Sequence, residues 1–158
     1  MFAAGVLVVA WAAGLFRSDT VVEPESVDYR AIAAEAEPEA GFVLAVPADL
    51  PTAWRATSAR WDPGDRLWHL GILTADEEYV EVEQSDDPAV VAAANEAEPT
   101  PAGSVDVEGT AWRRLVDEPA GEVSLVYRSS NSTTLVTGTA PEATLTAFAA
   151  TLPLSTTS

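Results

Sequence analysis

The sequence predicts an α+β domain: an antiparallel sheet of about six to seven strands, with a short middle helix and a C-terminal helix packed on one face. Between residues 42 and 138, short runs of alternating apolar and polar residues are separated by Pro, Gly, Asn and Asp, as in strands joined by turns. The helical segments do not alternate with these runs, which argues against a parallel βαβ sheet. A chain of 158 residues is long enough for one domain with a core.

The N-terminal segment is apolar without a break over residues 2–16 (FAAGVLVVAWAAGLF). At about 1.5 Å per residue, a helix of this length falls short of the ~20 residues that cross a bilayer. A signal peptide is one interpretation, because Ala10-Trp11-Ala12 fits a cleavage pattern, but a basic n-region is missing. A buried core helix is another, although no polar stripe is present. We favour a transmembrane anchor over 1–17 that is truncated at its start.

An acidic segment follows this apolar run. Residues 19–41 hold seven acidic side chains against Arg30 alone, and few large apolar residues. Such a composition supplies too little apolar surface for a core of its own. We therefore predict an acidic stalk over 18–41 with at most a short helix at about 27–36, a folded domain over 42–154 and a tail over 155–158.

The strands are predicted from alternation and are bounded by turn residues. They cover 42–46, 54–61, 67–73, 79–85, a hairpin over 104–117 that turns at Gly109-Thr110, 122–128 and 133–138.

Two helices complete the predicted domain. Asp87-Pro88 has the form of an N-cap followed by proline at the first helical position, and it opens the short middle helix. The C-terminal helix begins after Thr139 and Glu142, which are spaced as in a capping box. Its apolar stripe at helical spacing consists of Leu145, Phe148, Ala149 and Leu152.

The register of the hairpin over 67–85 follows from the cost of burying charge. A three-residue loop at 75–77 matches apolar with apolar residues across the two strands, whereas a shift by one residue would bury Glu81 and Glu83. The apolar pairs are Leu70–Val82 and Ile72–Val80. The pairs on the other face are His69–Glu83, Gly71–Glu81 and Leu73–Tyr79.

His69 is the only histidine of the sequence, and together with Glu81 and Glu83 it is the candidate for a weak cation or ligand site. One histidine and two carboxylates do not complete a structural zinc shell, and the loop acids lack the spacing of a calcium loop. No G-x-S-x-G motif places a nucleophile. We therefore expect a solvated sheet face with a partly exposed His69–Glu83 pair, and we predict no catalytic, cofactor-binding or metal residues.

Four tryptophans, Trp54, Trp61, Trp68 and Trp112, are all predicted to lie in strands. An aromatic platform for a ligand is one interpretation of Trp54, Trp61, Trp68 and Trp112, but alternation places Trp68 on the apolar face, so we favour core packing. The predicted structural signature of the domain is Trp54, Trp68, Gly71, Tyr79 and Trp112.

The composition argues against several classes of function. The chain has 25 acidic residues and eight basic ones, all of them arginine, for a formal charge of −17. This charge argues against nucleic acid or an anionic lipid surface as a partner. The absence of cysteine and lysine excludes disulfides, thiolate chemistry and Schiff bases. We predict no cofactor.

Several stretches resemble the actinobacterial domain of unknown function family 4245. These are LPTAWRATSARW, LWHLGILTADEEYVEVEQSD, VEGTAWRRL and TLVTGTAPEATLTAFAATL, in order over about 42–152. The resemblance implies a single-pass protein of the cell membrane with its domain outside the cytoplasm. Two features depart from the family: the basic N-terminal tail is missing, and the turn expected as Pro-Asp-Gly reads Ala75-Asp76-Glu77. A non-glycine residue then has to adopt a left-handed conformation.

From these observations we expect a non-catalytic binding or interaction module outside the membrane, with the membrane itself and an envelope protein of unknown identity as partners. The alternatives are a small carboxylate-dependent hydrolase that acts on envelope glycans and a purely structural envelope component.

Overall fold

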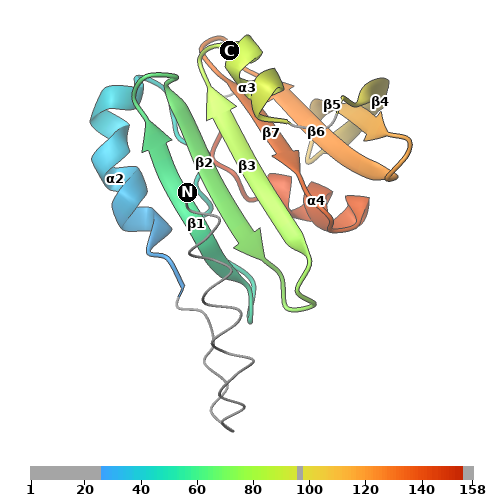
Figure 1. Cartoon of the computed structure of the whole chain (residues 1–158), viewed down its shortest axis with the longest axis horizontal. Helices are drawn as coiled ribbons and strands as arrows, with labels where there is room; N and C mark the ends of the chain where they lie inside the picture. The colour runs from blue at the N-terminus through green and yellow to red at the C-terminus, as the bar shows by residue number, and fades with distance from the viewer. Residues whose placement is uncertain (1–25, 96–97, 155–158) are drawn as a thin grey trace, which may run out of the picture.

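A computed structural model describes residues 26–95 and 98–154, and within these ranges the chain forms one seven-stranded antiparallel sheet with three helices (Figure 1). The elements in chain order are α2 (Tyr29–Ala40), β1 (Arg55–Asp62), β2 (Leu67–Leu73), β3 (Tyr79–Ser85), α3 (Pro88–Ala94), β4 (Thr100–Val107), β5 (Thr110–Asp117), β6 (Glu122–Arg128), β7 (Thr133–Thr137) and α4 (Glu142–Ala149). The predicted α+β class, the short middle helix and the C-terminal helix are confirmed.

The sheet consists of two meanders that meet in its centre. Its strand order is β1-β2-β3-β7-β6-β5-β4, so the last strand of each meander, β3 and β7, pair with each other. Val82 lies opposite Val136 in this central pair. Residues far apart in the chain therefore share one sheet face beside β3.

The main core lies on the face covered by α2 and α4. Trp68, Leu70, Val82 and Val136 point into it, and Leu145 of α4 packs with them. Trp68 and Trp112 are both fully buried, which confirms core packing for these two tryptophans. Trp54 precedes β1 and stacks on Phe148, with 6.2 Å between the ring centroids.

The segment 42–46, predicted as a strand, belongs to the core without pairing to the sheet. Its backbone instead binds buried side chains: the Ala45 N–H donates to Gln84 Oε1 (2.8 Å), and the Gln84 amide donates to the Val43 carbonyl (2.9 Å). The Trp68 indole donates to the Ala45 carbonyl (3.1 Å). Side chains of β2 and β3 thus satisfy polar groups that a neighbouring strand would otherwise satisfy.

Helix α2 differs from the predicted stalk. It is 12 residues long, Asp28 caps its first turn, and its buried face packs beside β1. That face consists of Tyr29, Ala33, Ala36 and Ala40, while the acids of the helix are exposed. Alanines at helical spacing allow close packing but carry a weak hydrophobic signal. Residues 27–41 are therefore part of the folded domain.

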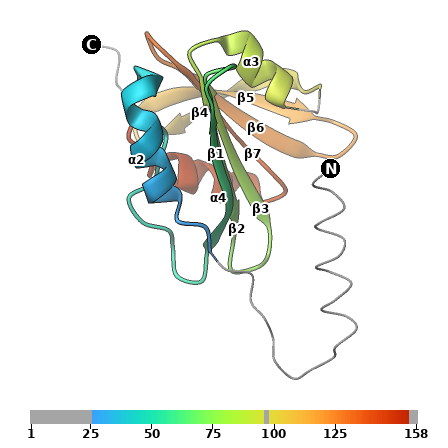
Figure 2. The same ribbon diagram turned by 60° about the vertical axis from the view of Figure 1, so that its left-hand side comes forward.

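Helix α3 lies on the opposite face of the sheet from α2 and α4 (Figure 2). Val91 of α3 and Leu135 of β7 are buried, but neither belongs to the main core. The side chain of Asp87 accepts a hydrogen bond from the Ala89 N–H at 2.9 Å, and Pro88 opens the helix, as predicted. The two faces of the sheet are thus both covered in part, rather than one face alone.

The β2–β3 hairpin has the predicted register at every position, including His69–Glu83, Gly71–Glu81 and Leu73–Tyr79. Glu77 in the loop has a φ of +61°, which is the left-handed conformation expected from the missing glycine.

The capping box predicted for the C-terminal helix does not form. Thr139 Oγ1 instead accepts a hydrogen bond from the Tyr79 N–H at 2.9 Å, and Glu142 pairs with Arg114. Pro141 occupies the N-cap position without a side-chain cap.

The predicted anchor over 1–17, the start of the stalk and the tail over 155–158 lie outside the described residues. Within 26–95 and 98–154, every helix is too short or too polar to cross a membrane.

Candidate functional site

A cleft of about 480 Å³ opens on the α3 face of the sheet. Its floor comes from β2, β3 and β7, and its walls come from the C-terminal end of α3 and from the end of the β5–β6 hairpin. A cleft of this size is within the range of small-molecule sites. Besides His69, Tyr79, Glu81 and Glu83, its polar lining residues are Arg60, Asn95, Asp117, Glu122, Ser124, Thr137 and Thr139.

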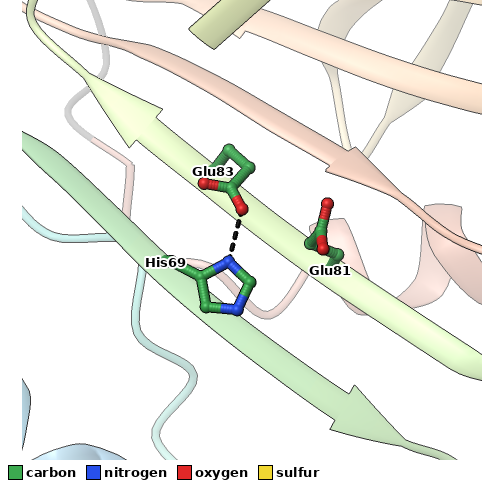
Figure 3. A group of neighbouring side chains, drawn as sticks. All are labelled: His69, Glu81 and Glu83. Carbon is green, nitrogen blue, oxygen red and sulfur yellow. Dashed lines mark hydrogen bonds and ion pairs between the residues drawn. The ribbon is translucent and has the colours of Figure 1, made fainter. Parts of the chain in front are cut away.

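His69 and Glu83 form a buried ion pair or hydrogen bond on the cleft floor (Figure 3). His69 Nδ1 faces Glu83 Oε1, and the two residues are only 5% and 3% exposed. The prediction of a partly exposed pair on a solvated face is therefore wrong. The register was right, but α3 and the β5–β6 wall cover this face, and a hairpin pattern by itself does not reveal what packs over it.

Ser58 completes a polar chain with this pair and was missed in the sequence. Its Oγ lies 2.9 Å from His69 Nε2. A β-bulge between Ala56 and Ser58 adds one residue to β1, so Ser58 rather than Thr57 lies opposite Gly71 on the cleft face. Since a bulge reverses the alternation locally, periodicity could not place Ser58 beside the histidine.

Gly71 creates room for the neighbouring polar groups. A Cβ at this position would overlap the Tyr79 hydroxyl and Ser58 Oγ. The glycine of the predicted signature is thus needed for close packing over β2, and not for an unusual backbone conformation. Burial, followed by the charge of Glu81, raises the pKa of the Tyr79 hydroxyl above its ordinary value.

Glu81 lies beside the pair on β3, two residues from Glu83 (Figure 3). Its carboxylate accepts one long hydrogen bond, from the Tyr79 hydroxyl at 3.4 Å. Burial raises the pKa of Glu81, and the charge of Glu83 raises it further, while His69, Tyr79 and Arg60 act in the opposite direction. The site therefore concentrates negative charge that its own residues neutralise only in part.

The structure brings the three predicted cation candidates together. One ligand atom from each of His69, Glu81 and Glu83 lies within 4.8 Å of the others. The second oxygen of Glu83, Oε2, is buried without a hydrogen-bond partner. An unsatisfied buried carboxylate oxygen is costly unless a ligand or ion reaches it.

The tryptophans of the predicted signature support the fold rather than line the cleft. Trp54, Trp68 and Trp112 lie outside it, and Tyr79 is the one aromatic residue among its described lining residues. This arrangement does not form the aromatic platform considered for the tryptophans.

Comparison with known proteins identifies a family but no characterised relative. The model of the family described as "Protein of unknown function (DUF4245)" matches residues 1–152. No curated protein and no solved structure matches the chain. Since the family model covers nearly all of the chain, this protein, with its acidic cleft over a buried His69–Glu83 pair, belongs to the DUF4245 family.

Proposed function

We propose that the protein is a non-catalytic binding module attached to the membrane of an actinobacterial cell, and that its cleft binds a small ligand or partner group of positive charge outside the cytoplasm. The proposed binding site rests on one observation, the cluster of acidic residues around the buried His69–Glu83 pair. Glu81, Glu83, Asp117 and Glu122 line the cleft, whereas Arg60 is its one arginine among the described lining residues. Such a concave, negatively charged site favours cations over neutral or anionic ligands.

The membrane attachment is supported by the apolar run at residues 2–16 and by what the family resemblance implies. Expression of the full chain in an actinobacterial host, followed by cell fractionation, tests it. We expect an intact chain in the membrane fraction. A shortened soluble protein that starts near Ala13 would show signal cleavage and would contradict the anchor.

The binding function is testable by NMR on the uniformly ¹⁵N-labelled chain kept free of metal by a chelator. A panel of small organic cations, including polyamines, amino sugars and quaternary amines, is titrated against neutral analogues of matched size. We expect saturable shifts of the His69 ring and of the Asn95 and Thr137 amides with a cation. Shifts confined to the surface around Val43, which is exposed and outside the cleft, would refute the assignment of the site.

A second candidate function is hydrolysis, and one specific observation favours it. Ser58, His69 and Glu83 are hydrogen-bonded in the order nucleophile, base and carboxylate. A glycan hydrolase is less well supported, because it needs two carboxylates on either side of the scissile bond, about 5–9.5 Å apart. Glu81 and Glu83 instead project from neighbouring positions of one strand, with oxygens within 4.8 Å.

A fluorophosphonate probe tests the serine-based hydrolase directly. Covalent labelling of the wild-type chain that is absent in Ser58→Ala would establish an activated nucleophile. We expect no labelling above that of the variant, because Ser58 is not among the residues that line the cleft.

A further inference from the structure

We propose that His69, Glu81 and Glu83 bind one divalent transition-metal ion such as Zn²⁺, and that Ser58 orients the imidazole ring for it. This inference rests on the proposed function, because it names the class of cation that the cleft binds.

The geometry of the three side chains is close to that of a metal site. Zinc binds histidine nitrogen and carboxylate oxygen at about 2.0–2.2 Å, so ligand atoms around one ion lie about 3–3.5 Å apart. The ligand atoms here lie within 4.8 Å of one another, and closure requires side-chain movements of roughly 1–2 Å. Glu81 is free to make such a movement, because it is partly exposed and is held by one 3.4 Å hydrogen bond.

The charge and burial of the group favour a dication. Two carboxylates face one imidazole, and Glu83 is almost completely buried with Oε2 unpartnered. A bound dication would neutralise both carboxylates and give Oε2 a partner. On binding, the ion takes the place of the hydrogen between His69 Nδ1 and Glu83 Oε1, and the neutral ring then carries its one proton on Nε2.

Ser58 is suited to support the metal-binding tautomer of the ring. With a metal at Nδ1, the imidazole carries its proton on Nε2, which then donates to Ser58 Oγ at 2.9 Å. In the serine-based hydrolase considered above, the direction of this hydrogen bond is reversed, because the Ser58 hydroxyl donates to His69 Nε2. The protonation of Nε2 therefore distinguishes the two functions.

The donor set selects among cations. One nitrogen and carboxylate oxygens suit Zn²⁺ or Mn²⁺, whereas Ca²⁺ and Mg²⁺ prefer shells made of oxygen alone. Three protein ligands leave a coordination position for water or for a donor atom of a larger ligand, as in open zinc sites.

The test uses the full chain, stripped of metal by a chelator and then titrated with Zn²⁺ by isothermal calorimetry and by ¹⁵N NMR of the histidine ring. Since His69 is the only histidine, one ring reports the site without assignment. We expect binding of one equivalent, a large shift of Nδ1, a proton on Nε2 in the bound state, and at least tenfold weaker binding of Ca²⁺ and Mg²⁺. An absence of saturable binding, or binding that leaves the ring unchanged, overturns the proposal.

Three variants locate the site. Ser58→Ala removes a supporting partner of the ring and should weaken Zn²⁺ binding by about 10–100-fold. Glu81→Gln removes a ligand and should weaken Zn²⁺ binding by more than that. Asp86→Asn makes the same charge change outside the cleft and should leave the Zn²⁺ affinity unchanged. Equal losses of Zn²⁺ affinity in Glu81→Gln and Asp86→Asn would indicate diffuse counterion attraction and would also overturn the proposal. Thermal unfolding of each metal-free variant verifies that it is folded.

The outcome is separable from that of the proposed function. Binding of an organic cation by the chelated protein without any zinc binding refutes the metal site and leaves the binding module. Zinc binding at His69 supports both, and the failure of both titrations refutes both.

Discussion

Replacement of Glu83 by Gln is the most direct test of the buried pair. The side chains of His69 and Glu83 are 6% and 4% exposed, so the variant leaves His69 in a site with little water. Removal of one partner from a buried pair costs about 3–5 kcal/mol. The Gln side chain keeps a neutral hydrogen bond to the ring, worth about 1 kcal/mol. Relief of the repulsion between Glu83 and Glu81 offsets a further part of this cost. We therefore expect the free energy of unfolding to fall by about 2–3 kcal/mol.

The assay is urea unfolding of the metal-free chain at pH 7, followed by tryptophan fluorescence, because Trp68 is fully buried. Asp86→Asn is the matched control, since it breaks the Arg66–Asp86 pair, whose side chains are 40% and 39% exposed. That change should cost about 0–1 kcal/mol. Equal losses in the two variants would refute the burial argument and restore the solvated face that the sequence suggested.

Three further predictions concern single residues. Glu81→Gln should stabilise the metal-free protein at neutral pH, because burial and the charge of Glu83 raise the pKa of Glu81. This gain in stability should vanish below pH 4.5, where the carboxyl group is neutral in the unfolded chain as well. Glu142→Gln should destabilise the protein near neutral pH, because Arg114 lowers the pKa of Glu142. This loss of stability should shrink as the pH falls through the lowered pKa of Glu142. The urea midpoint, measured as a function of pH, tests the predictions for Glu81→Gln and Glu142→Gln. Gly71→Ala should lower the melting temperature and shift the NMR signals of the His69 ring, because the added methyl group displaces the Tyr79 hydroxyl. An unchanged ring spectrum would show that the hydrogen bonds around His69 do not depend on this glycine.

Local patterns in the sequence predicted the parts of the fold that depend on local physics. The β2–β3 register follows from the cost of burying Glu81 and Glu83 on the apolar face, and the helix start at Asp87 follows from its capping chemistry. The same arguments failed where the answer depends on distant parts of the chain. They treated α2 as a stalk because alanines are weakly apolar, and they took the segment 42–46 for a strand although Gln84 and Trp68 bind its backbone.

The site shows the same limit. His69, Glu81 and Glu83 were identified as a group from one hairpin, because residues opposite one another in a register are neighbours in space. The burial of His69 and Glu83 was not predictable from that hairpin, because the elements that flank the cleft, α3 and the β5–β6 hairpin, come from other parts of the chain.

The contrast between the two faces of the hairpin supports a functional origin for the polar one. Leu70 and Val82, on one face, are fully buried in an apolar core. On the other face, equally buried positions hold His69 and Glu83, where apolar side chains of similar volume would avoid desolvation of a charge. A fold that needed only stability would gain from such a replacement, yet here a third acid, Glu81, adds repulsion beside the pair. Local destabilisation of this kind is characteristic of binding sites, and the gain in stability expected for Glu81→Gln measures it.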